Sequence, residues 1–135
     1  MPMKLTLTFP LPPDDLSPNA RVHYLAKARA AATYRKSAKL LSRSKLNASG
    51  TSETWFRFLE EEPQLRLTET YRIAGKRKRD VRNLFAAFKA GEDGLVDAGI
   101  IPGDDDSVLE HGAPKIERVA SKKDEGILVV IEAVV

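Results

Sequence analysis

Alternating apolar and polar positions near both ends of the chain predict β-strands. Residues 3–9 alternate without exception, which is the period of a strand that buries one face. The apolar side of this strand comprises Met3, Leu5, Leu7 and Phe9. The same spacing predicts a strand over residues 65–73. Residues 115–119 and 126–134 predict two more strands, joined by a turn at residues 121–125.

Residues 20–44 follow the longer period of a helix, with apolar residues three and four positions apart. The predicted buried stripe consists of Tyr24, Ala28, Ala31, Tyr34, Ala38 and Leu41. Because half of this stripe is alanine, we expect the helix to pack closely on the sheet. The proline-rich residues 10–18 cannot continue a sheet ladder and predict an ordered loop. Residues 47–52 predict a break, and the stretch around Trp55 fits neither period.

A second helix is predicted over residues 81–98, with Asp80 at its start. Its apolar side carries Val81, Leu84, Phe88 and Leu95. Gly91 and Gly94 have low helix propensity, so we expect an irregular middle. Residues 101–106 read Ile-Pro-Gly-Asp-Asp-Asp and predict a turn.

The order of these elements, β-α-β-α-β-β, predicts an α+β fold with two main helices packed on a mixed sheet. A chain of 135 residues suits a single small domain, here residues 1–135, and is too short for two. An apolar share of 42% and a charged share of 30% are typical of a globular domain and do not suggest disorder.

The composition excludes several kinds of chemistry. The chain has no cysteine, which rules out disulfides, thiolate metal sites and thiol nucleophiles. With only His23 and His111, a histidine-built zinc site is not expected. No apolar run reaches the length of a membrane span, and the alternating N-terminus does not form the apolar core of a signal peptide. We therefore expect an intracellular, cytoplasmic protein without a membrane partner.

Basic residues are unevenly distributed along the chain. The net charge is only +3, yet residues 16–52 contain eight Lys or Arg and no Asp or Glu, whereas the remainder holds 14 basic and 19 acidic residues. A second basic run occupies residues 76–79, with Arg82 shortly after it. Basic surfaces beside a carboxylate-rich remainder suit a polyanion such as nucleic acid. Alternatively, a long helix can carry a solvated basic face without any partner.

Two groups of carboxylates flank the second predicted helix. Asp80 lies where a strand leads into the helix, and Asp104, Asp105 and Asp106 lie in the turn after it. A straight helix of this length spans roughly 27 Å and would keep the two groups apart. They can meet if the helix is shorter or broken, or the site can be shared between subunits.

Carboxylates close together among Lys and Arg would suit phosphodiester hydrolysis. Hard oxygen ligands hold Mg²⁺, which generates hydroxide and neutralises developing charge, while basic residues hold the phosphates. A purely structural interpretation is also open. Asp80 can serve as a helix N-cap supported by Asn83, the acidic turn can be a solvated turn, and Lys89 can be a solvated helix lysine.

Several short motifs occur in order along nearly the whole chain. Near the N-terminus, Phe-Pro-Leu-Pro-Pro at residues 9–13 is followed by Leu-Ser-Pro-Asn-Ala-Arg at 16–21 and His-Tyr at 23–24. The later motifs are Lys-Arg-Lys-Arg-Asp-Val-Arg-Asn-Leu at 76–84, Phe-Lys-Ala at 88–90, Asp-Gly-Leu-Val-Asp-Ala-Gly-Ile at 93–100 and Gly-Asp-Asp-Asp-Ser-Val at 103–108. In this combination the chain resembles the RusA family of Holliday-junction resolvases.

The resemblance implies an α+β homodimer that resolves four-way DNA junctions with Mg²⁺ held by aspartates, where Mn²⁺ can substitute. By position, Asp80 matches the first catalytic aspartate of the family. Asp104 and Asp105 match a later pair in which Asp105 is the catalytic member, and Asp93 matches a helix aspartate. Lys89 stands near, though not at, the position of a functional lysine.

One position departs from the family motif. The motif usually reads Asp-x-Asp-Asn, whereas residues 80–83 read Asp-Val-Arg-Asn. Arg82 thus replaces a metal-binding carboxylate with a cation that stays protonated in proteins. Either Asp93, Asp104 or Asp106 supplies the missing ligand and Arg82 contacts the scissile phosphate, or metal binding is impaired and the protein binds branched DNA without cutting it efficiently.

The resulting hypothesis is a dimeric endonuclease of DNA recombination and repair, of the kind common in phage genomes. Asp80 and Asp105 are expected to bind metal with help from Asp104 or Asp93, and Lys89 to stabilise charge on the phosphate. The residues expected to contact DNA are Arg21, Lys27, Arg35, Lys36, Lys76, Arg77, Lys78, Arg79 and Arg82. A basic adaptor domain with neither metal dependence nor selectivity among polyanions is the further alternative.

Overall fold

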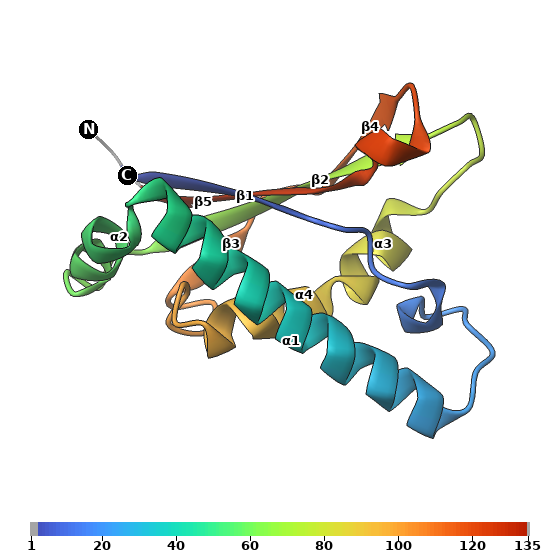
Figure 1. Cartoon of the computed structure of the whole chain (residues 1–135), viewed down its shortest axis with the longest axis horizontal. Helices are drawn as coiled ribbons and strands as arrows, with labels where there is room; N and C mark the ends of the chain where they lie inside the picture. The colour runs from blue at the N-terminus through green and yellow to red at the C-terminus, as the bar shows by residue number, and fades with distance from the viewer. Residues whose placement is uncertain (1–2, 135) are drawn as a thin grey trace.

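The computed structural model describes residues 3–134, and its elements are arranged as in Figure 1. The strands are β1 (Lys4–Phe9), β2 (Leu65–Ala74), β3 (Leu109–His111), β4 (Lys115–Val119) and β5 (Gly126–Ala133). The helices are α1 (Tyr24–Ser49), α2 (Ser52–Leu59), α3 (Val81–Ala87) and α4 (Lys89–Asp97), and the 3₁₀ turns are Asp14–Leu16 and Lys122–Asp124. These elements form a small α+β domain with a mixed sheet, which confirms the predicted fold class.

β2 lies at the centre of the sheet. On one side β5 pairs with it antiparallel, and β1 pairs antiparallel with β5. On the other side β3 and β4 both run parallel to β2. Between these two strands, Gly112 donates its N–H to the carbonyl oxygen of Leu67 at 2.9 Å. A Cβ on Gly112 would lie 2.6 Å from Oγ1 of Thr68, so only glycine lets the chain follow β2 this closely.

The helices cover one face of the sheet. Figure 1 shows α1, α3 and α4 on the same side of the strands. The side chains of β1 and β2 alternate strictly between buried and more exposed positions, so one face of these strands lies in the core. The buried residues of the sheet include Leu5, Leu7, Phe9, Leu65, Leu67, Tyr71, Ile73, Leu109, Ile127, Val129 and Ile131. Within residues 3–134, no helix is both long enough and apolar enough to cross a membrane.

α1 is shifted toward the C-terminus relative to its predicted range of residues 20–44. It begins at Tyr24, after His23, whose Nδ1 accepts the N–H of Leu25 at 3.2 Å. It continues through most of the predicted break and ends at Gly50, whose φ of 70° belongs to the left-handed region. Of the predicted break at residues 47–52, only residues 50 and 51 lie between helices.

The predicted buried stripe of α1 is correct only in its middle. The buried residues are Tyr34, Ala38, Ser42 and Leu46. Tyr24, Ala28 and Leu41 are exposed, with Tyr24 at 73%, so their prediction as core residues was wrong. Figure 1 shows the reason for Tyr24 and Ala28, because α1 runs obliquely and its N-terminal end lies farthest from the strands.

The second predicted helix is two helices, but the break is not at its glycines. α3 ends and α4 begins at Phe88, which is fully buried. Gly91 and Gly94 lie within the regular part of α4, where they permit close packing. A Cβ on Gly94 would lie 2.4 Å from the carbonyl oxygen of Arg35 in α1, and one on Gly91 would lie 2.4 Å from the ring of Phe88.

Two short elements were not predicted. α2 positions Trp55, which is 1% exposed and donates its indole N–H to the carbonyl oxygen of Ile100 at 2.9 Å. β3 has only three residues, too few for a period to be recognised. Both owe their conformation to contacts with residues far away in the sequence, such as the pairing of Leu109 with Leu65.

Candidate active site

Asp80 begins α3 as its N-cap. Its backbone is extended, and its Oδ1 accepts the N–H of Arg82 at 2.8 Å. This hydrogen bond satisfies one of the free N–H groups at the start of the helix. The structural interpretation of Asp80 is therefore confirmed, and it does not prevent Oδ2 from binding another group.

Asp80 also lines a basic pocket of about 260 Å³. The pocket lies between the N-terminal loop and the start of α3, and its lining includes Pro12, Asp14, Asn19, Arg77, Lys78, Arg79, Asp80 and Asn83. Gly75, with a φ of 84°, allows the chain to turn out of β2 into this basic run. Arg118 of β4 then holds the turn, because its guanidinium donates to the carbonyl oxygens of Gly75 at 3.3 Å and Arg77 at 2.8 Å.

The break at Phe88 determines where Lys89 lies. The ring of Phe88 packs against those of Phe9 and Tyr34, with centroids 5.8 Å and 6.1 Å apart. This anchor ends α3 after seven residues and starts α4 in the core, with the exposed Lys89 as its first residue. Of the arrangements left open by the sequence, the structure shows the broken helix.

Lys89 lies between two of the predicted carboxylates. Its Nζ is 3.1 Å from Oδ1 of Asp93, one helical turn along α4, and it also contacts Oδ2 of Asp104 in the acidic turn. The hydrogen bond and charge of Lys89 lower the pKa of Asp104, and the same hydrogen bond raises the pKa of Lys89. Lys89 and Asp104 are therefore charged at neutral pH, and together with Asp93 they form one cluster.

The other two aspartates of the turn lie outside this cluster. Asp105 accepts the N–H of Ser107 through Oδ1 at 2.8 Å, and this backbone hydrogen bond lowers its pKa. The backbone of the same residue accepts from Val108 and Leu109, so Asp105 shapes the turn into β3. The side chain of Asp106 is exposed, and its carbonyl oxygen accepts a hydrogen bond from Gln64.

The predicted metal ligands are brought together only in part. Within residues 3–134, no three His, Asp or Glu side chains are grouped so that they alone could hold a metal ion. Nor does the Asp80 carboxylate of the described chain form a hydrogen bond or ion pair with Lys89, Asp93 or Asp104. Asp93 and Asp104 are brought near each other, because both contact the same ammonium group. Two carboxylates completed by water and phosphate oxygens are a usual site for Mg²⁺, so this pair fits such an ion in donor chemistry.

The residues expected to contact DNA fall into two groups. Arg21, Lys36, Lys76, Arg77, Lys78 and Arg82 are exposed, and Arg79 is half-buried. Arg35, however, donates two hydrogen bonds to Asp97 at 2.6 and 2.8 Å and so joins α1 to α4. Lys27 donates to the carbonyl oxygen of Ser17 at 3.4 Å, which ties α1 to the loop before it.

A buried polar network beside the cluster was missed. Glu69 is 2% exposed and accepts a hydrogen bond from the hydroxyl of Tyr71, while Glu92, 5% exposed, is 2.8 Å from Nε2 of His111. Burial, together with the charge of Glu92, raises the pKa of Glu69 to about 7, against the opposing hydrogen bond from Tyr71. The sequence held one signal for this network, since Glu69 falls on the apolar side of the alternation in residues 65–73.

Comparison with known proteins identifies a similar protein, but that protein has no assigned activity. No protein-family model matches the chain. It is similar to an uncharacterised protein of Xylella fastidiosa (strain Temecula1), with 36% identity over 113 residues. The match covers 83% of this chain and 66% of the relative.

Proposed function

We propose that the protein is a Mg²⁺-dependent endodeoxyribonuclease that cuts four-way DNA junctions, and that it acts in the cytoplasm as a homodimer. The observation that carries this proposal is the arrangement along α3 and α4, where a basic pocket lined by two carboxylates, Asp14 and Asp80, is followed by a cluster of two carboxylates and a lysine. A phosphodiester backbone with a bound cation complements both parts. The resemblance to RusA resolvases supports the choice of branched DNA.

The basic pocket is suited to hold the DNA backbone. Arg77, Lys78 and Arg79 lie on a turn whose carbonyl oxygens are fixed by Arg118, so their charges are presented together. Contacts of Lys and Arg with phosphates supply most of the affinity of such surfaces and release counterions. A homodimer matches a four-way junction because both have two-fold symmetry.

The Asp93–Asp104 pair is the part of the chain best placed to hold Mg²⁺. Asp80, in the basic pocket, and Asp105, in the turn, remain further catalytic carboxylates of the proposal, although neither contacts the pair. When bound, Mg²⁺ lowers the pKa of a coordinated water and neutralises charge on the phosphate. Lys89 holds the two carboxylates together before binding. In the complex its ammonium has a phosphate oxygen as its partner, where it stabilises the negative charge that develops during hydrolysis.

The second candidate is a junction-binding protein that cuts poorly. Arg82 occupies a position where a carboxylate is expected, and Lys89 offsets part of the negative charge of the Asp93–Asp104 pair. Both features weaken the attraction for a divalent cation without affecting the basic pocket.

Cleavage of a synthetic four-way junction, beside a linear duplex and with or without Mg²⁺, tests the proposal. The wild type should nick the junction in Mg²⁺ or Mn²⁺, whereas Asp80→Asn, Asp104→Asn and Asp105→Asn should not. Asp124→Asn is the matched control, because Asp124 is exposed in the turn Lys122–Asp124 away from the cluster. Junction binding without cutting in any divalent cation would contradict the nuclease and leave the binding protein.

A further inference from the structure

A second pocket, of about 520 Å³, lies beyond the start of α3 and differs from the basic pocket in character. It is lined by Arg82, Phe85, His111, Gly112, Ala113 and Pro114. Its walls are mostly apolar, and none of these residues carries a carboxylate. Its volume falls within the usual range of about 300–1,000 Å³ for small-molecule sites.

Contacts with Glu92 and Phe85 hold the imidazole of His111, which lines this pocket, in place. His111 directs Nε2 to the buried carboxylate of Glu92 at 2.8 Å, and its ring meets that of Phe85 edge-to-face, with centroids 5.5 Å apart. Glu92 thereby fixes the orientation of the imidazole. Gly112, the next residue of the lining, is fixed as well, because a side chain there has no space against Thr68. The pocket is therefore preformed, with an aromatic wall, an apolar wall and a cation at its edge.

The same pocket adjoins the carboxylate cluster. Glu92, which holds His111, precedes Asp93 in α4, and the pKa of Asp104 is lowered mainly by Lys89 and to a smaller extent by the charge of His111. A group bound in the pocket would thus lie next to the residues assigned to the chemistry.

We propose that the Arg82–Phe85–His111 pocket binds one unpaired nucleotide of the DNA, with the base against Phe85 and Pro114 and the phosphate on Arg82. This inference rests on the proposed function and adds to it that the DNA substrate presents an unpaired nucleotide. An aromatic face beside an apolar wall suits a base of any sequence, and a guanidinium suits a phosphate. Arg82, which departs from the family motif, then has a role in holding the substrate instead of a metal.

The base must leave the duplex to reach this pocket. Within a duplex both faces of a base are covered by its neighbours, so a wall such as Phe85 has no free face to contact. Bases at a branch point have weakened stacking and are the easiest to extrude. The pocket therefore favours branched or single-stranded DNA over linear duplex.

The test uses 2-aminopurine, a base whose fluorescence reports stacking, placed in turn at each branch position of a four-way junction. With the wild type, fluorescence should change at one branch position and its symmetry mate, and not in a linear duplex. Phe85→Leu and Arg82→Gln should lose this change and bind the junction about 5- to 100-fold more weakly, the expected effect of losing one stacked base.

Phe85→Leu retains apolar volume, and thermal unfolding checks that each variant is folded. Phe56→Leu is the matched control, because Phe56 is a partly exposed aromatic residue on α2.

The outcomes separate this inference from the proposed function. If the wild type cuts junctions in Mg²⁺ while both pocket variants keep the fluorescence change and the affinity, the pocket assignment is overturned and the nuclease stands. If the fluorescence change depends on Phe85 and Arg82 but no DNA is cut, the pocket assignment stands and the nuclease fails. An unchanged 2-aminopurine signal with the wild type at every branch position also overturns the pocket assignment.

Discussion

The starts of α3 and α4 carry opposite arrangements of charge. At the start of α3, the carboxylates of Asp80 and Asp14 share a pocket with three basic residues, Arg77, Lys78 and Arg79. At the start of α4, the single ammonium of Lys89 lies between Asp93 and Asp104. The first region attracts an anion and the second attracts a cation. The proposed substrate, a phosphodiester backbone with Mg²⁺, complements both regions.

Reversing charge in the first region should have the strongest effect. Arg77→Glu combined with Lys78→Glu removes two phosphate contacts and adds repulsion. Junction affinity near 150 mM salt should fall on the order of 100- to 1,000-fold, and the slope of log affinity against log salt should decrease by about two. Fluorescence anisotropy at several NaCl concentrations measures both.

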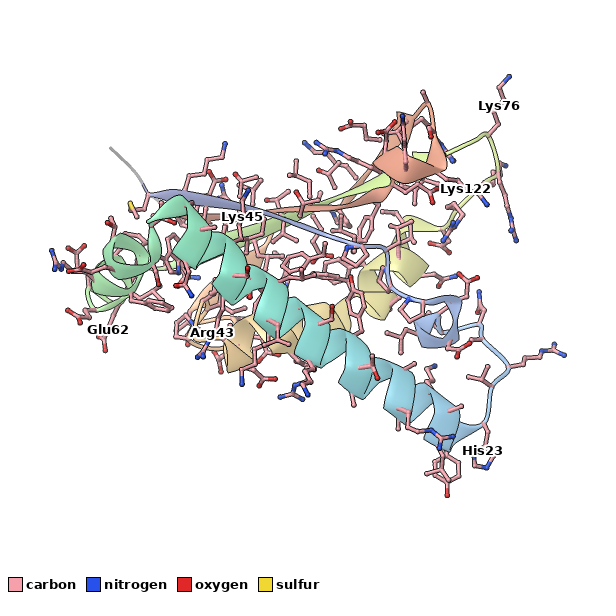
Figure 2. All side chains as sticks on the ribbon, viewed as in Figure 1. His23, Arg43, Lys45, Glu62, Lys76 and Lys122 are labelled. Atoms are coloured by element: carbon pink, nitrogen blue, oxygen red, sulfur yellow. The ribbon has the colours of Figure 1, made fainter. Side chains whose placement is uncertain are left out.

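The control for this pair is Lys4→Glu combined with Lys45→Glu, which changes the net charge equally. Figure 2 shows Lys45 and Lys76 toward opposite ends of the molecule. An equal loss of affinity in both double variants would show that overall charge, and not the basic pocket, governs binding.

Glu69 is buried beside the cluster of Lys89, Asp93 and Asp104, and its ionisation makes the free energy of unfolding depend on pH. Its pKa is raised from an ordinary value of 4.5 to about 7 by burial, so the folded protein holds a proton that the unfolded chain has released between these pH values. The contribution of Glu69 to stability is therefore complete below pH 4.5, declines as pH rises to 7 and stays lost above it. The loss amounts to roughly 3 kcal/mol.

Comparison with Glu69→Gln isolates this effect from other titrating groups. Urea unfolding at pH 4.5 and pH 8 should show a larger loss of stability for the wild type than for the variant over this interval. Equal losses in both proteins would mean that Glu69 ionises as freely in the folded state as in the unfolded chain.

A substitution at the contact between α4 and α1 tests how strongly the packing of these two helices stabilises the fold around Lys89. Gly94→Ala places a Cβ 2.4 Å from the carbonyl oxygen of Arg35. We expect a loss of about 1–3 kcal/mol in the free energy of unfolding, because neither helix backbone can move without disturbing the core. Thermal unfolding measures it. Gly103→Ala is the control, because the nearest atom to its Cβ, on Val108, lies at an ordinary 3.9 Å.

Removing Lys89 tests the second region most directly. Lys89→Met leaves Asp93 and Asp104 without their shared cation, so the affinity for Mn²⁺ should rise by a factor of about 2 to 5, the strength of an exposed ion pair. Cleavage should fall, because the phosphate loses a positive partner. Mn²⁺ titration followed by water proton relaxation measures the affinity, and unchanged binding would show that the metal does not use this pair.

The strands were predicted more accurately than the helices. β1, β2, β4 and β5 were placed to within one residue at each end, because alternation along a strand is a local property of the sequence. In α1 the same reasoning gave three wrong core residues, Tyr24, Ala28 and Leu41. Periodicity shows which residues share a face of a helix, but it does not show how far along its length that face is covered.

The candidate site was predicted in composition but not in arrangement. Asp80, Lys89, Asp93 and Asp104 were all identified from the sequence, yet Lys89 joins Asp93 to Asp104 and leaves Asp80 with the basic run. The second pocket was not predicted. Its residues come from α3, from the end of β3 and from the link between β3 and β4, and their proximity depends on the parallel pairing of β3 and β4 with β2.

The sequence alone determined the α+β class, most of the strands and the presence of carboxylates among basic residues, since each follows from local periodicity or residue chemistry. Only the tertiary structure decided that the helix breaks at Phe88, that Lys89 lies between two aspartates and that Arg82 shares a pocket with His111. The physical reason is that Phe88 is anchored by Phe9 and Tyr34, residues more than fifty positions away in the chain. Such contacts form through packing in the folded core and leave no periodic trace in the sequence around them.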